Sequence, residues 1–123
     1  MTNSHHTIQY VELGVGSADQ VAEAKAFYGG LFGWEFNDYG PDYAGIKDPH
    51  GDGEVGGLNG GRPGGRGGCL VLLESDDVDA SFAAVEAAGG VIVEPVEPYP
   101  AGRRFTFTDP AGNWLGVFQV ESG

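Results

Sequence analysis

Basic residues are scarce in this 123-residue chain, which carries 6 Lys and Arg against 18 Asp and Glu. The formal net charge of −12 excludes the clustered cationic surface that a nucleic-acid backbone requires. The same charge argues against binding to an anionic membrane surface. We therefore expect neither a nucleic-acid partner nor a membrane partner.

Cysteine and long apolar runs are almost absent as well. The single Cys69 excludes a disulfide framework, and its apolar neighbours predict a small buried residue in a reducing compartment, with a free reactive thiol as the alternative. No run is long enough to span a membrane, and polar residues follow Met1 where a secretory leader would be apolar. These absences predict a cytoplasmic protein.

Turn and strand patterns are abundant instead, and they recur. An Asp-Pro turn with a following glycine occurs at Asp48 and again at Asp109, about sixty residues later. Each half also begins with an apolar run, followed by an Ala-rich segment with helical periodicity. The chain therefore predicts two copies of one unit, each about sixty residues long.

Each copy has the predicted order strand, helix, and then three strands. The helices are expected at 21–31, with an apolar stripe that includes Phe27 and Leu31, and at 78–88. We predict an α+β fold in which two βαβββ modules form an open, curved mixed-sheet barrel around a cleft. The expected parts of this single domain are module 1 at about 6–58, a flexible Gly-rich connector at about 59–68, and module 2 at about 69–121.

Segments in the order 24–28, 32–36, 76–80, 87–90 and 109–113 resemble the vicinal-oxygen-chelate superfamily. That superfamily contains glyoxalase I, bleomycin and fosfomycin resistance proteins, and extradiol dioxygenases. The resemblance covers nearly the whole chain. It implies paired βαβββ modules around a cleft, usually in a homodimer.

The resemblance also implies where a divalent ion would bind in the superfamily's metalloenzymes. Their ligands are His, Gln and Glu side chains on strands that face the cleft. The matching positions here are Tyr10, the stretch 55–58, Leu70 and Gly116. Tyrosine, glycine and leucine do not make a divalent site, so we predict no bound metal and no cofactor.

Charged candidates for the site come from the strand faces. Glu12 shares the face of Tyr10, so it should face the cleft, where a desolvated carboxylate with a raised pKa could act as catalytic acid or base. The alternative is a Glu12 carboxylate satisfied by an arginine or by backbone donors. Arg103 and Arg104 point to opposite faces, so one of them could bind a ligand's carboxylate or phosphate, or form an ion pair, for example with Glu12.

Aromatic residues supply further candidates for ligand binding. Most of the aromatic residues are expected in the core, but a subset, with Tyr39, Phe105 and Trp114 as candidates, could line an apolar pocket in which the Tyr10 hydroxyl is the polar group. The histidines lie in a tail and in a turn and are expected to be solvated. No Ser-His-Asp arrangement is present, and the lone cysteine has no evident base.

These observations favour a small-molecule-binding protein, similar to glyoxalase and bleomycin resistance proteins, that has lost the family metal site. Its expected ligand is aromatic or amphipathic and lies between the modules. One alternative is a lyase or isomerase of the glyoxalase type that uses Glu12 as base, or a metal held by other ligands. A third hypothesis is an interaction module with a vestigial cleft, so the sequence leaves open whether the protein is an enzyme.

Overall fold

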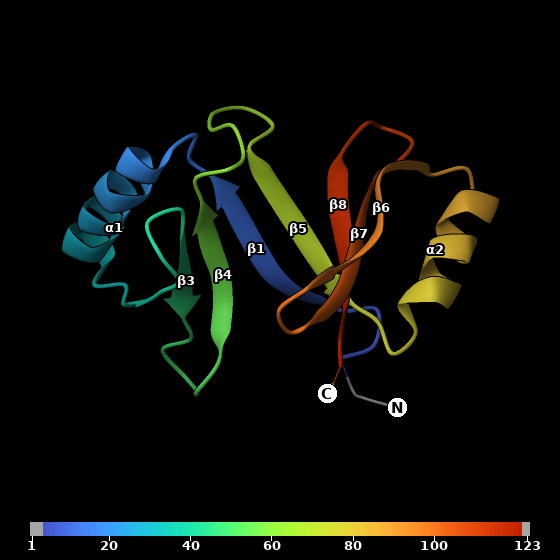
Figure 1. Cartoon of the computed structure of the whole chain (residues 1–123), viewed down its shortest axis with the longest axis horizontal. Helices are drawn as coiled ribbons and strands as arrows, with labels where there is room; N and C mark the ends of the chain where they lie inside the picture. The colour runs from blue at the N-terminus through green and yellow to red at the C-terminus, as the bar shows by residue number, and fades with distance from the viewer. Residues whose placement is uncertain (1–3, 122–123) are drawn as a thin grey trace. The chain divides into compact units, whose positions relative to one another are not determined.

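The computed structural model describes residues 4–121, and Figure 1 shows the arrangement of its elements. Module 1 contains β1 (Ile8–Gly14), α1 (Ala18–Phe32), β2 (Phe36–Asp38), β3 (Tyr43–Lys47) and β4 (Glu54–Asn59). Module 2 contains β5 (Cys69–Glu74), α2 (Val78–Ala87), β6 (Val91–Tyr99), β7 (Gly102–Thr108) and β8 (Trp114–Val120). The predicted α+β class and the repeated βαβββ order are confirmed.

The sheet of module 1 is open and has the strand order β2-β3-β4-β1. Strands β1 and β4 are parallel, whereas β2, β3 and β4 pair antiparallel. Helix α1 contacts β3 and β4, as Figure 1 shows. The core between helix and sheet is built from Val21, Ala44, Ile46 and Leu58.

Capping residues fix both ends of helix α1. The Ser17 hydroxyl accepts a hydrogen bond from the Gln20 amide, and Gly33 ends the helix with a left-handed φ of 73°. The predicted apolar stripe is wrong at two positions, because Phe27 and Leu31 are 61% and 58% exposed. The core-facing part of the helix is therefore narrower than its sequence periodicity indicates.

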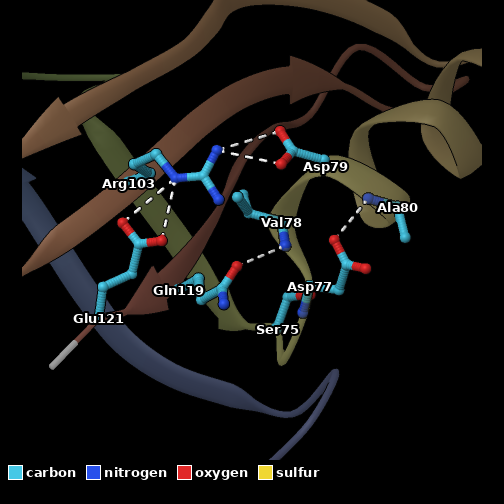
Figure 2. Close-up of polar contacts among 8 residues, drawn as sticks. All are labelled: Ser75, Asp77, Val78, Asp79, Ala80, Arg103, Gln119 and Glu121. Carbon is cyan, nitrogen blue, oxygen red and sulfur yellow. Dashed lines mark hydrogen bonds and ion pairs between the residues drawn. The ribbon is translucent and has the colours of Figure 1, made fainter.

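The sheet of module 2 repeats this arrangement in the order β5-β8-β7-β6, with β5 and β8 parallel and the other pairs antiparallel. Its core consists of Val78, Phe105 and Val117, and α2 contacts β6, β7 and β8. The Asp77 carboxylate caps α2 by accepting from the Ala80 amide, and the Gln119 side chain accepts from the Val78 amide (Figure 2). One strand of the sheet thus helps to fix the start of the helix.

The two Asp-Pro turns are built around their aspartates, as predicted. The Asp48 carboxylate accepts from the His50 amide, and the Asp109 carboxylate accepts from the amides of Ala111 and Asn113. The Asn113 side-chain amide, which donates to the Asp109 carboxylate at 3.0 Å, is the largest cause of the lowered pKa of Asp109, and the two backbone amides add to it. Gly112 closes the second turn with a φ of 86°.

The Gly-rich connector is hydrogen-bonded to module 1 near both of its ends. The Gly14 amide donates to the Gly68 carbonyl, and the Gly16 amide donates to the Arg62 carbonyl. A side chain at Gly14 would overlap the Pro63 carbonyl, so the connector packs directly on the end of β1. Glycine at position 14 permits this close backbone approach.

Two further expectations are wrong. Cys69 is exposed, although its apolar neighbours predict burial. His5 is partly buried instead of solvated, because its Nδ1 accepts from the Asp76 amide at 2.9 Å and its ring stacks on His6. The His6 ring in turn contacts the Ser81 hydroxyl at 3.1 Å.

The chain divides into two compact units, Tyr10–Leu70 and the residues from Val71 onward, the latter together with the N-terminal residues through Gln9. Within the second unit, the His6 amide donates to the Glu74 carbonyl. No helix in the part of the chain that the structure describes is long and apolar enough to cross a membrane.

Candidate functional site

One face of the module 1 sheet gathers polar and aromatic side chains, and we call it the polar face. The register places Glu12 beside Gly57, Gly57 beside Gly45, and Gly45 beside Asn37. Alternation along the strands directs these residues away from the core that packs under α1. The side chains of the polar face are Tyr10, Glu12, Asn37, Tyr39, Tyr43, Glu54 and Asn59.

Glu12 lies at the centre of one hydrogen-bond network on this face. The residue is 1% exposed, and its carboxylate accepts from the Tyr43 hydroxyl and the Asn59 amide, each at 3.0 Å. The Arg62 guanidinium completes the set with Nε 2.9 Å from Oε1. The arginine that satisfies Glu12 is therefore Arg62 of the connector, and not Arg103 or Arg104.

Two tyrosines extend this network. The hydroxyls of Tyr10 and Tyr43 lie 2.6 Å apart, and because Tyr43 donates its proton to Glu12, Tyr10 is the donor to Tyr43. Burial raises the pKa of Tyr10 to about 12. Burial and the Glu12 charge also raise the pKa of Tyr43 well above its ordinary value. Both hydroxyls are therefore neutral hydrogen-bonding groups at physiological pH.

Glu54 forms a second network on the same face. Its Oε2 accepts from the Asn37 amide at 2.9 Å and from the Tyr39 hydroxyl. The hydrogen bond to Glu54 is the largest cause of the raised pKa of Tyr39. Tyr39 and Tyr43 have ring centroids 6.2 Å apart, so the two networks lie next to each other.

The polar face depends on two glycines at its centre. A Cβ at Gly57 would overlap the Tyr43 hydroxyl, and a Cβ at Gly45 would overlap the Glu54 carboxylate. Any larger residue at these positions would displace a functional group. The glycines thus make room for side chains from neighbouring strands.

The candidates in module 2 have different surroundings. Arg103 forms ion pairs with Asp79 on α2 and with Glu121, at 3.0 Å and 3.2 Å, as Figure 2 shows. The Arg104 guanidinium lies over the Tyr99 ring, 5.8 Å from its centroid. Phe105 is 0% exposed in the core, and Trp114 is half-buried at the start of β8. The structure therefore connects Tyr10, Glu12 and Tyr39 through one face, whereas these four residues belong to other environments.

Sequence reasoning missed several residues of the polar face. Arg62 is one of only 6 Lys and Arg residues, and this rarity was the only sequence feature that could have marked it as a candidate. Tyr43 alternates with Gly45 on β3, but periodicity alone does not show which hydroxyl approaches Glu12. Glu54 and Asn59 flank a glycine pair and gave no sequence signal of their own.

Known proteins share this architecture. The sequence profile of the Glyoxalase/Bleomycin resistance protein/Dioxygenase superfamily matches residues 7–117. This chain belongs to that superfamily. No curated protein sequence matches it.

Solved structures of the superfamily are similar to this chain. The Mn(II)-bound glyoxalase from Novosphingobium aromaticivorans is 29% identical with a TM-score of 0.67, over 91% of this chain and 38% of that one. Methylmalonyl-CoA epimerase from Mycobacterium tuberculosis is 15% identical with a TM-score of 0.68, over 99% and 93%. A superfamily member from Vibrio splendidus 12B01 is 16% identical with a TM-score of 0.65, over 89% and 96%. The last two show the fold alone.

The superfamily's divalent ion does not fit the residues found here. At the positions implied by the resemblance, Tyr10 holds its proton up to a pKa of about 12, Leu70 is fully buried, and Gly57 and Gly116 have no side chain. Among residues 4–121, no three His, Cys, Asp or Glu side chains are grouped to hold a metal. The donor chemistry at these positions is therefore unsuited to a divalent cation.

Proposed function

We propose that this protein binds an aromatic or amphipathic small molecule on the polar face, without a metal ion. The observation that carries the proposal is the network around Glu12, where two neutral hydroxyls, one of them at the metal-ligand position Tyr10, adjoin an ion-paired carboxylate. Neutral hydroxyls beside aromatic rings suit a ligand with an apolar ring and a polar substituent. Tyr39, which is 59% exposed, offers such a ring at the surface.

The alternative in which Glu12 is a catalytic base has less support. A base needs a free lone pair directed at its substrate, whereas three donors occupy the Glu12 carboxylate, one of them a guanidinium. We therefore assign Glu12 the role of holding Tyr43 and Arg62 in place. The location of the ligand between the modules, the homodimer and the cytoplasmic location stay predictions.

The proposal is tested by calorimetric titration with naphthylmethanol, a neutral aromatic alcohol, in EDTA and again with Mn²⁺. Binding is expected in EDTA and should be unchanged by Mn²⁺. Tyr39→Ala should weaken it about fivefold, the equivalent of an aromatic contact worth about 1 kcal/mol.

Phe27→Ala is the matched control, because Phe27 on α1 is 61% exposed and Tyr39 is 59% exposed. This variant should bind naphthylmethanol like the wild type. Absence of binding, binding that requires Mn²⁺, or a loss in Phe27→Ala instead of Tyr39→Ala would each overturn the proposal.

A further inference from the structure

Glu54 is a carboxylate whose charge is not balanced by a neighbouring cation. Its hydrogen-bond donors are the Asn37 amide and the Tyr39 hydroxyl, which are both neutral. Within residues 4–121, no Lys, Arg or His forms an ion pair with it. Both hydrogen bonds use Oε2, so Oε1 keeps its lone pairs for another donor.

Three basic residues of module 1 and the connector pair with other acids. Lys25 pairs with Asp38, and Arg62 pairs with Glu12. Lys47 is the register partner of Glu54 across a β-bulge, yet its Nζ lies 4.0 Å from Glu35. A carboxylate that stays unpaired beside a lysine-bearing strand is available to a cation from outside the chain.

The surroundings of Glu54 are those of a recognition site for a cation. The carboxylate lies over Gly45, where a Cβ would overlap it, so it packs directly on the face of the sheet. The rings of Tyr39 and Tyr43 stand next to each other at 6.2 Å with an angle of 52°. Aromatic faces beside a carboxylate attract ammonium and guanidinium groups through the ring quadrupole. The net charge of −12 also favours the approach of a cation over that of an anion.

We propose that the ligand of the polar face is an organic cation, an aromatic or amphipathic amine or guanidinium compound, whose charged group binds Glu54 beside Tyr39. This inference rests on the proposed small-molecule binding and adds the charge of the ligand. The cation donates to Oε1 of Glu54, while its apolar part contacts the tyrosine rings. Asn37 and Tyr39 fix the carboxylate through Oε2 before the ligand arrives.

The test compares three probes with the same ring, namely naphthylmethylammonium, naphthylmethanol and naphthoate, by calorimetric titration at neutral pH and low salt. The cation should bind about tenfold more tightly than the alcohol, and naphthoate should bind weakest. The advantage of the cation should shrink as salt is added, because the interaction is electrostatic and partly exposed.

Two variants locate the effect. Glu54→Gln keeps the shape and the hydrogen bonds but removes the charge, so it should lower the affinity for the cation to that for the alcohol. Gly45→Ala keeps the charge but displaces the carboxylate, and it should also abolish the preference. Glu23→Gln is the matched control, because it removes one charge from an exposed position of α1 in the same module and should keep the preference.

The outcomes separate this inference from the proposed function. Equal affinity for the three probes, or an unchanged preference in Glu54→Gln, would overturn the inference and leave small-molecule binding intact. A preference lost equally in Glu23→Gln would show that only the overall charge acts, and this too would overturn it. Failure of all three probes to bind would overturn both.

Discussion

The two modules pair residues in the same way across their sheets but place different chemistry in the pairs. In module 1 the paired residues, in order across the sheet, are Glu12, Gly57, Gly45 and Asn37. In module 2 the equivalent residues are Leu72, Gly116, Thr106 and Glu94. The first strand thus carries an acid in one module and an apolar side chain in the other, each opposite a glycine.

This difference shows what a glycine at that position permits. Gly57 leaves space for the hydroxyls of Tyr43 and Tyr10, whereas Gly116 leaves space for a methyl group of Leu72. The buried acid of module 1 then needs donors, which Tyr43, Asn59 and Arg62 supply. Leu72 needs none, and the polar contact of this row in module 2 is instead the hydrogen bond that the Thr106 hydroxyl donates to Glu94 at 2.8 Å.

The largest loss of stability is expected when Glu12 of module 1 is replaced by leucine, the residue at the equivalent position of module 2. Glu12→Leu leaves the Arg62 guanidinium, whose side chain is 11% exposed, without its carboxylate and should lower the free energy of unfolding by about 3–5 kcal/mol. Urea unfolding measures the loss. The control is Glu12→Leu with Arg62→Met, which removes both charges and should recover most of the stability. A loss below about 1 kcal/mol in the single variant would contradict a buried, mutually dependent pair.

The comparison also explains how much of this architecture was predictable. Element order followed from periodicity and from turns such as those at Asp48 and Asp109, because these signals are local. The common face of Tyr10 and Glu12 followed from alternation along a single strand. Local rules were therefore sufficient to predict the element order of the modules and the common face of Tyr10 and Glu12.

Partners from distant segments were not predictable in this way. The side chain that meets Glu12 comes from Arg62, which lies in a glycine-rich segment whose composition indicates flexibility. The direction of Arg103 depends on Asp79 of α2, which no strand pattern reveals (Figure 2). Phe105 alternates like a pocket residue, yet the helix packed on its sheet makes it core. In each case tertiary contact decided the role.

A smaller effect is expected from adding one methyl group to each glycine. Gly57→Ala forces both tyrosines to move and breaks the Tyr10–Tyr43 hydrogen bond, so it should cost about 2–3 kcal/mol. Gly116→Ala meets the methyl end of Leu72, which can rotate away, and should cost about 1 kcal/mol. The midpoints of urea unfolding compare the two variants when their unfolding slopes are equal. A greater loss of stability in Gly116→Ala than in Gly57→Ala would contradict the assigned roles of the glycines.

The smallest effects concern the titration of one tyrosine in each module. Burial raises the pKa of both Tyr10 and Tyr99; the Glu54 charge adds to the rise at Tyr10, whereas the Arg104 charge opposes it at Tyr99. Glu54→Gln should therefore lower the pKa of Tyr10 from about 12 and leave Tyr99 unchanged, and Arg104→Gln should raise the pKa of Tyr99 alone. Tyrosine ring resonances followed by NMR against pH give both values.

The sign of the linked stability effect follows from the same pKa. Because folding raises the pKa of Tyr10 from 10.0 to about 12, the folded state keeps a proton that the unfolded state releases. The stabilising contribution is therefore complete below pH 10 and is lost as the pH rises toward 12. Glu54→Gln removes a negative charge that opposes ionisation of Tyr10, so the loss of this stabilising contribution should be complete at a lower pH in the variant. An unchanged pH range for this loss would mean that the Glu54 charge does not act on the Tyr10 hydroxyl.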